Sequence, residues 1–221
     1  MSWGGPVLSI ANLNVSISAV HILRGVSLEL AGASMTGLIG RNGAGKTTLM
    51  KSVMGLLKAS SGQIRFFDSD LLKIPTHQRS MLGIGYMPED RRLIPDLTVE
   101  ENILVPAWAL KLPDARERLK KIYEYIPELR GFAPRKGLQL SGGQQKMAAL
   151  GRALMCGTKL LLLDEPFEGV APALARRLAE VIAGLKKEGM SILVSESDLQ
   201  HSERMVDRVV TIDRGAISTS G

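Results

Sequence analysis

With 221 residues, the chain is long enough for one domain with a substantial core and too short for two such domains. Its 45% hydrophobic and 23% charged residues are ordinary for a globular protein. No apolar run reaches the ~18 residues of a membrane-spanning helix, so such a helix is excluded. The single cysteine excludes an intrachain disulfide and disfavours a zinc site. The net charge of +6 is dispersed among acidic residues, which predicts a solvated surface rather than a surface for nucleic acid. Because the first residues lack the pattern of a signal peptide, we expect a cytoplasmic protein.

The first third of the chain is predicted to be rich in β-strands. Alternating or short apolar patterns predict strands over residues 7–15, 26–30, 35–39, 63–67 and 82–87. A helix is predicted over residues 47–57, directly after a glycine-rich turn.

The middle of the chain has a helical pattern. Thr98, followed three residues later by Glu101, forms a capping box, which predicts that a helix begins there. Residues 115–125 form a second, charged and amphipathic helix candidate. We therefore expect a helical insertion over residues 89–153.

The last third alternates strands and helices. The leucine run at residues 159–163 is typical of a parallel strand that is buried on both faces. After it, a helix, a strand, a helix and a strand are predicted over residues 173–187, 191–195, 198–205 and 208–212. This alternation predicts an α/β fold with a mostly parallel sheet. We expect one domain, whose core comprises residues 1–88 and 154–221.

A glycine-rich stretch between a predicted strand and a predicted helix fits the phosphate-binding P-loop pattern. It comprises Gly40, Arg41, Asn42, Gly43, Ala44, Gly45, Lys46 and Thr47, followed by Thr48. Glycines let successive backbone N–H groups point at phosphate oxygens, and the following helix presents its positive end. We expect Lys46 to bridge the outer phosphates, Thr47 to ligate Mg²⁺ and Thr48 to bind a phosphate. The alternative is an ordinary glycine-rich turn that caps a helix.

Two carboxylates, Asp164 and Glu165, follow the leucine run. Ligands of open α/β sheets bind at the carboxyl ends of the strands, and the P-loop is expected at the same edge. We therefore expect Asp164 to hold Mg²⁺ through water, and Glu165 to activate or orient the attacking water. A solvated acidic pair before a turn is the alternative.

A third motif precedes the acidic strand and contains Leu140, Ser141, Gly142, Gly143 and Gln144. Ser141 and Gln144 form a capping box at a predicted helix start. The glycine N–H groups at the positive end of that helix also make an anion site.

Together, the P-loop, the Leu-Ser-Gly-Gly-Gln motif and the Leu-Leu-Leu-Asp-Glu-Pro motif resemble the ATP-binding cassette (ABC) family in order and spacing. The resemblance covers essentially the whole chain. It implies a P-loop ATPase core with an N-terminal antiparallel β-subdomain and an inserted helical subdomain, using ATP and Mg²⁺. It also implies a head-to-tail dimer, in which the signature residues Ser141, Gly142, Gly143 and Gln144 contact the γ-phosphate on the partner's P-loop.

Residues 86–92, 97–102 and 164–172 resemble more narrowly the ATPase subunits of branched-chain amino-acid importers. Glu89 stands where most ABC proteins have glutamine, and we expect it near the metal. In that subgroup two different ATPase subunits act on two different permease subunits. A periplasmic solute-binding protein delivers the solute to these permease subunits. The resemblance thus implies a heterodimer with a second ABC ATPase subunit, attached to the inner face of the membrane through residues 89–102.

Two positions around the nucleotide depart from the usual ABC pattern. Ile17 stands where the family usually has an aromatic residue on adenine, so base stacking is expected to be weaker, although Val20 or His21 could pack there instead. Ser197 stands at the position of the switch histidine. Because serine is shorter and carries no charge, we expect slower hydrolysis. His201, one helical turn later, is expected to be a surface residue; the alternative is that it substitutes for the switch histidine.

A third departure is Ala171, which replaces the aspartate of the loop that crosses the dimer interface. The branched-chain subgroup shares this alanine, so the departure supports the narrower resemblance. Communication between the two ATP sites is expected to differ from that in other ABC dimers.

These features favour a subunit that hydrolyses ATP to power a separate permease, an importer of amino acids or related small solutes. A soluble ABC ATPase that acts on nucleic acid or ribosomes commonly carries two cassettes or a long coiled coil, which 221 residues do not accommodate. A regulatory ABC module with low turnover would fit Ile17 and Ser197, but it would not need Glu165. Other subunits of such importers select the solute.

Overall fold

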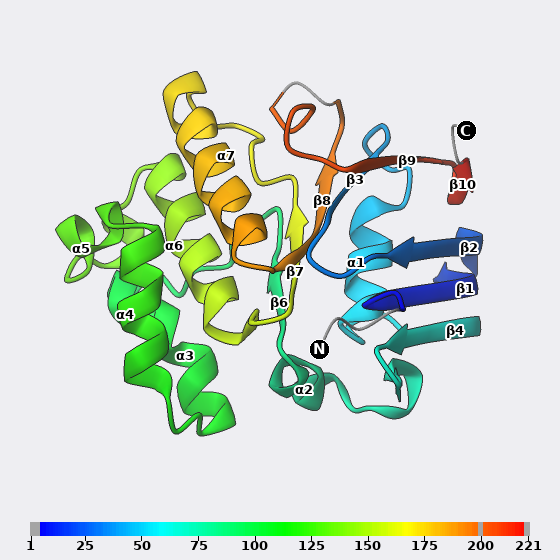
Figure 1. Ribbon diagram of the computed structural model, residues 1–221, viewed down its shortest axis with the longest axis horizontal. Helices are drawn as coiled ribbons and strands as arrows, with labels where there is room; N and C mark the ends of the chain where they lie inside the picture. The colour runs from blue at the N-terminus through cyan, green and yellow to red at the C-terminus, as the bar shows by residue number, and fades with distance from the viewer. Residues whose placement is uncertain (1–4, 199–200, 219–221) are drawn as a thin grey trace.

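The computed structural model describes residues 5–198 and 201–218 and contains two sheets flanked by helices (Figure 1). The strands are β1 (Leu8–Ile17), β2 (Val20–Leu30), β3 (Met35–Ile39), β4 (Ser61–Phe66), β5 (Ser69–Asp70), β6 (Ile84–Met87), β7 (Leu160–Asp164), β8 (Ser191–Glu196), β9 (Arg208–Asp213) and β10 (Ala216–Ser218). The α-helices are α1 (Lys46–Val53), α2 (Thr76–Arg79), α3 (Val99–Leu110), α4 (Ala115–Tyr125), α5 (Glu128–Phe132), α6 (Gly142–Cys156) and α7 (Pro172–Lys187).

The larger sheet has the order β10-β9-β3-β8-β7-β6 and is parallel except for β10, which pairs antiparallel with β9. The α/β prediction with a mostly parallel sheet is confirmed. Because parallel strands end at the same edge of a sheet, the segments that follow β3, β7 and β8 lie close together at that edge. This edge carries the P-loop after β3 and the acidic pair at the end of β7.

The smaller sheet is antiparallel, with the order β2-β1-β4-β5, and α1 lies between it and the larger sheet (Figure 1). It confirms the expected N-terminal antiparallel unit. Strand β2 begins at Val20, earlier than predicted, because it pairs with β1 through a tight turn. Ser18 and Ala19 in this turn have φ values of 46° and 68°. Neither is glycine or asparagine, so the sequence lacks the usual signal for such a turn.

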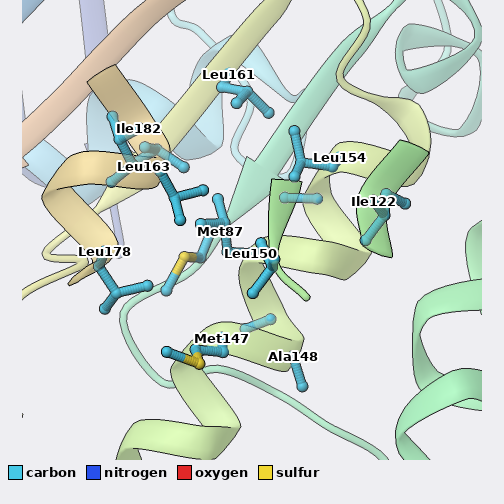
Figure 2. Close-up of a cluster of buried hydrophobic side chains, with 14 of the residues drawn as sticks. Met87, Ile122, Met147, Ala148, Leu150, Leu154, Leu161, Leu163, Leu178 and Ile182 are labelled. Carbon is cyan, nitrogen blue, oxygen red and sulfur yellow. The ribbon is translucent and has the colours of Figure 1, made fainter. Parts of the chain in front are cut away.

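The four leucines of β7 divide between two cores. Leu161 and Leu163 pack with α3, α4, α6 and α7, as the close-up of this cluster shows (Figure 2). Leu160 and Leu162 point to the opposite face, toward α1 and the antiparallel sheet. Alternation along a strand sends successive side chains to opposite faces, so a continuous leucine run is required where both faces are covered.

Helices α3 to α7 cover one face of the larger sheet (Figure 1). The predicted capping box at the start of α3 is present: the Glu101 N–H donates to Thr98 Oγ1 at 3.2 Å, and the Thr98 N–H donates to Glu101 Oε2 at 2.7 Å. Helix α6 runs through the predicted end of the insertion at residue 153, so the boundary between core and insertion stays a prediction. None of the helices in the described part of the chain combines the length and apolar character needed to cross a bilayer.

Several predicted ends were wrong for identifiable backbone reasons. The helix predicted over residues 47–57 ends at Val53, because Gly55 adopts a left-handed φ of 75°. The strand predicted over residues 82–87 begins at Ile84, after a short 3₁₀ turn (Ser80–Leu82) and Gly83 with a φ of 97°. Apart from β2, which begins six residues before its predicted start, and the helix described next, the other predicted strands and helices are present with ends shifted by two residues at most.

The helix predicted over residues 198–205 is wrong: its described residues form turns, and residues 199–200 lie outside the described part. One polar group of this segment has a tertiary partner: the carbonyl oxygen of Met205 accepts a hydrogen bond from Lys186 at 3.0 Å. Just beyond the segment, the Asp207 carboxylate accepts from the N–H of Met35 at 2.8 Å. These tertiary contacts compete with the helical pattern, which local sequence alone suggested.

Candidate active site

The P-loop connects β3 to α1, as predicted. Its tight path requires glycine, because a Cβ at Gly40 would lie 2.3 Å from the carbonyl oxygen of Ile212, and Gly45 has a φ of 115°. Loop residues line two cavities of about 570 and about 350 Å³, which share Asn42 and Gly43 in their walls. The loop therefore borders open space in which a phosphate chain could lie.

The two cavities gather residues that are distant in the sequence. The smaller one is lined by Ile22, Asn42, Gly43, Gly45, Lys46, Thr47, Thr48, Glu89 and Glu165. The larger one is lined by Gly40, Arg41, Asn42, Gly43, Ala44, Ser197, Thr211, Ile212, Asp213 and Arg214. Most of the predicted phosphate, water and switch residues thus meet at one edge of the sheet.

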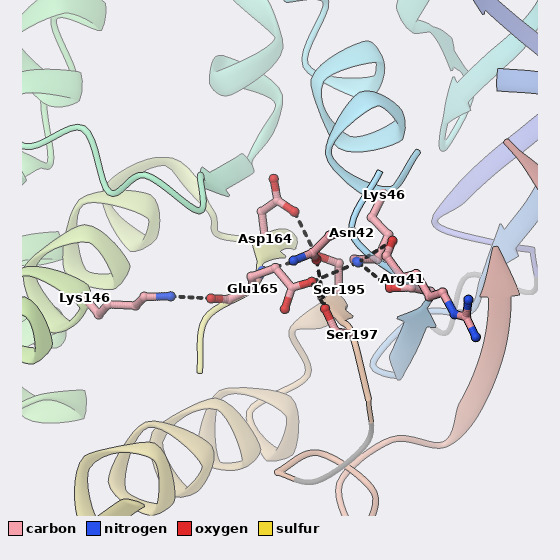
Figure 3. A network of polar contacts seen from close by, with 9 residues as sticks. Arg41, Asn42, Lys46, Lys146, Asp164, Glu165, Ser195 and Ser197 are labelled. Carbon is pink, nitrogen blue, oxygen red and sulfur yellow. Dashed lines mark hydrogen bonds and ion pairs between the residues drawn. The ribbon is translucent and has the colours of Figure 1, made fainter. Parts of the chain in front are cut away.

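Lys46 carries the positive charge of the smaller cavity. Its side chain is 5% exposed, and its ammonium lies 2.9 Å from Glu165 Oε1 and 3.3 Å from the carbonyl oxygen of Arg41 (Figure 3). A buried charge needs such partners to offset its lost hydration. The ion pair brings the cation of the P-loop into direct contact with the second carboxylate of the acidic strand end.

Asp164 is fully buried at the end of β7, and its two oxygens have different partners. Oδ1 accepts from Ser195 Oγ at 2.8 Å, and Oδ2 accepts from the hydroxyl of Tyr86 at 3.2 Å. Burial and the adjacent Asp164 raise the pKa of Tyr86 far above its usual value, so Tyr86 stays a hydrogen-bond donor. The two donors fix the orientation of this carboxylate.

Glu165 adopts a φ of 48°, which is uncommon for a residue with a side chain. Its N–H is held by the carbonyl oxygen and the Oγ of Ser195, each at 3.2 Å. The Ser197 hydroxyl lies 3.2 Å from Glu165 Oε1 and 3.0 Å from Asn42 Oδ1 (Figure 3). With one proton, Ser197 donates to one of them at a time.

Glu89, at the wall of the smaller cavity, is the third carboxylate of the site. Burial raises the pKa of Glu89, and the negative charges of Glu168, Asp164 and Glu165 raise it further. A cation in this cavity would relieve that repulsion. In the described part of the chain, no group of three or more histidine, cysteine, aspartate or glutamate side chains is arranged to hold a metal by itself.

The signature residues begin α6, with Ser141 as its N-cap. The predicted capping box is present: the Gln144 N–H donates to Ser141 Oγ at 3.3 Å, and the Ser141 N–H donates to Gln144 Oε1 at 3.1 Å. The signature residues 141–144 lie in the part of the chain that the structure describes, and none of them lines either of the two P-loop cavities. The structure therefore does not bring the signature to the P-loop of its own chain.

The residues considered for the base lie at the hairpin of β1 and β2. Ile17 is 41% exposed and Val20 is 59% exposed, and neither lines the two P-loop cavities. The His21 ring is 3.0 Å from Ser16 Oγ, whereas Ile22, which the sequence did not single out, lines the smaller cavity. His201, the alternative to Ser197, lies against Phe167 with ring centroids 5.4 Å apart.

Residues 23–168 match the family described as ABC transporter. The chain belongs to this family. It is 34% identical to the high-affinity branched-chain amino acid transport ATP-binding protein BraG of Pseudomonas aeruginosa, covering 96% of this chain and 91% of BraG. It is 31% identical to the lipopolysaccharide export system ATP-binding protein LptB of Haemophilus influenzae, covering 97% of this chain and 90% of LptB.

Among solved structures, the ADP conformation of an ATP-binding cassette of an ABC transporter superposes on this cassette with a TM-score of 0.82 and 30% identity. The match covers 96% of this chain and 89% of that one. The ABC fold is thus confirmed, and the chain is an ATP-hydrolysing subunit of a transporter.

Three residues that hold the acidic pair of this ABC subunit were missed by the sequence interpretation. Tyr86 contacts Asp164. Ser195 also contacts Asp164, and Lys146 of α6 donates to the carbonyl oxygen of Glu165 (Figure 3). The pairing of β7 with β8 places Asp164 opposite Ser195. That neighbour could have been found only by fixing the register of two predicted strands.

Proposed function

We propose that this ATPase works as a head-to-tail dimer, in which each ATP lies between the P-loop of one protomer and the signature residues of the other. The observation that carries the proposal is the placement of Ser141 to Gln144 outside both P-loop cavities of their own chain. The N–H groups of Gly142 and Gly143, at the positive start of α6, suit a phosphate. A second protomer would supply the groups that one chain lacks.

A thiol cross-link tests this arrangement. Asn42→Cys in one copy and Ser141→Cys in another are treated with a short bifunctional maleimide, with and without Mg-ATP. The native Cys156 is buried, which raises the pKa of its thiol to about 11 and keeps it unreactive. We expect dimers only with nucleotide and only when both substitutions are present. Cross-linking that is independent of nucleotide, or its absence with bound ATP, would contradict the head-to-tail dimer.

In each site, the P-loop residues Gly40 to Thr48 would bind the phosphates, with Lys46 at the outer ones. Thr47 and Asp164 would hold Mg²⁺, and Glu89 would face it, since Mg²⁺ prefers oxygen ligands and is usually completed by water and substrate phosphates. The site fits this ion because its donors are oxygen atoms and because the charges of Asp164 and Glu165 add to burial in raising the pKa of Glu89. Glu165 would accept a proton from the water that attacks the γ-phosphorus, while the bond to the β-phosphate oxygen breaks.

We further propose that the partner permease is an importer of amino acids or related small solutes. The name of BraG supports amino acids, whereas that of LptB shows that similar ATPases serve other cargo. The helical region 89–153 would act as a subdomain whose residues 89–102 contact the permease, so the chain would sit on the cytoplasmic face of the membrane. A periplasmic binding protein would deliver the solute, and no nucleic acid would take part.

A second, different ABC ATPase subunit is the partner that we propose for the dimer, on the basis of the subgroup resemblance. Purified chain, its candidate partner subunit and their equimolar mixture are compared for ATP hydrolysis and for mass in solution with Mg-ATP. We expect the mixture to form the larger share of dimers and to hydrolyse ATP faster than either chain alone. If the single chain hydrolysed ATP as fast as the mixture and had the same mass in solution, the heterodimer would be contradicted.

Ser197 limits hydrolysis in this scheme. Substitution by histidine brings a longer donor, and the protonated ring adds a second donor and a positive charge next to Glu165; a hydrogen bond to a charged group contributes about 1.5–3 kcal/mol. Ser197→His should therefore raise kcat by about ten- to a hundredfold. Steady-state hydrolysis by Ser197→His and Ser197→Ala checks this. A histidine variant that is no faster than the wild type would show that Ser197 is not the limiting group.

Ile17 is proposed to lie beside the adenine base. Ile17→Tyr adds a stacking surface, and aromatic pairs contribute about 0.5–1.5 kcal/mol, so we expect ATP to bind about two- to tenfold more tightly. Titration with ATP and GTP measures both the gain and its base selectivity. Val20→Tyr, on the same hairpin, is the matched control, and a larger gain there would place the base at Val20 instead.

A further inference from the structure

Lys146 is a buried cation that the scheme above does not use. It lies on α6, immediately after the signature and Gln145, and is 1% exposed. Among the described residues its ammonium forms no ion pair, and it donates a hydrogen bond to the carbonyl oxygen of Glu165 (Figure 3). A lysine is almost never fully buried without a compensating partner, so this contact calls for a functional or structural reason.

Charged groups from several segments surround this ammonium. The pKa of Lys146 is lowered to about 8, first by burial and then by Arg91, whereas Glu168, Glu165 and Glu89 act in the opposite direction. These carboxylates come from the segments that follow β6 and β7. The field of three carboxylates favours a cation at the point where α6 meets the acidic strand end.

The contact acts on an unusual piece of backbone. Glu165 holds a left-handed φ of 48°, and both of its polar backbone groups are hydrogen-bonded. Its N–H donates to Ser195 of β8, and its carbonyl oxygen accepts from Lys146 of α6 and, at 3.3 Å, from the N–H of Glu168. A non-glycine residue keeps such a conformation only when its surroundings hold it, and here one of these hydrogen bonds comes from the signature helix.

We propose that Lys146 is a positioning residue for ATP hydrolysis, which holds the backbone of Glu165 from the signature helix so that its carboxylate points at the P-loop. The inference rests on the proposed role of Glu165. In this arrangement a shift of α6 moves one of the donors that fix the backbone of Glu165. Productive water activation therefore depends on where the signature helix sits in the ATP-bound dimer.

The test is Lys146→Met, which keeps the length of the buried stem and removes the donor and the charge. We expect kcat to fall by about tenfold to a hundredfold, because a small misplacement of a reacting group has effects of this size. The KM for ATP, the nucleotide-dependent 42–141 cross-link and the melting temperature should stay close to those of the wild type. Lys146→Arg, which keeps a cation and its donors, should recover a substantial part of kcat. Lys120→Met on the exposed side of α4 is the matched control.

Wild-type kcat in Lys146→Met would overturn the inference. A joint change of kcat, KM and melting temperature would also overturn it, by showing a structural role only. If Lys146→Met does not fold, Lys146→Gln carries the same prediction, because its amide nitrogen is one bond closer to the backbone and uncharged. Glu165→Gln is measured alongside: wild-type hydrolysis there would refute the role of Glu165, whereas an inactive Glu165→Gln with a fully active Lys146→Met would refute only the role of Lys146.

Discussion

Glu165→Gln is expected to slow ATP hydrolysis by about a hundred- to ten-thousandfold, the usual contribution of a positioned general base. Nucleotide binding should persist, because the P-loop, Thr47 and Asp164 are unchanged. The substitution also removes the negative charge that lies 2.9 Å from Lys46, which leaves this ammonium free for phosphate. ATP should therefore bind at least as tightly as in the wild type, and the ATP-bound dimer should accumulate.

Steady-state hydrolysis and size-exclusion chromatography with Mg-ATP measure these two effects. Glu117→Gln is the matched control, because it makes the same chemical change at an exposed side chain of α4 that lines neither P-loop cavity. We expect this control to hydrolyse ATP at nearly the wild-type rate and to show no stable dimer. Hydrolysis by Glu165→Gln at the wild-type rate would remove Glu165 from the proposed reaction.

Lys46→Ala is expected to have the second large effect, a loss of tight ATP binding. The ammonium is held at the P-loop by backbone carbonyls and Glu165, where it can exchange the carboxylate for phosphate oxygens. Each hydrogen bond to a charged group contributes about 1.5–3 kcal/mol, so the affinity should fall by at least about ten- to a hundredfold. Without bound nucleotide, neither hydrolysis nor the cross-link to Ser141→Cys should be seen.

Calorimetric titration with Mg-ATP checks this loss. Lys51→Ala, on the last turn of the same helix α1, is the control and should bind ATP with wild-type affinity, since Lys51 is not among the residues that line the two P-loop cavities. Unchanged affinity in Lys46→Ala would contradict the P-loop role. Equal losses in both variants would point to a weakened helix rather than to a lost phosphate contact.

The sequence by itself determined the elements whose signals are local. The glycines and Lys46 of the P-loop, the capping boxes at Thr98 and Ser141, and the leucine run before Asp164 are patterns of neighbouring residues, and the structure contains each of them. Local backbone preferences and the two-face burial of a parallel strand suffice to specify them. The family motifs then gave the fold and the chemistry, because their order is itself part of the sequence.

Only the tertiary structure decided which distant side chains meet. The register of β7 with β8 sets Ser195 against Asp164, and the packing of α6 on the sheet brings Lys146 to the carbonyl of Glu165. The same kind of contact competes with the helix predicted at residues 198–205, where Lys186 binds the carbonyl oxygen of Met205 and Met35 binds Asp207 just beyond the segment. Contacts between residues far apart in the chain leave no periodic pattern in either segment, so they are fixed by packing and register rather than by local sequence.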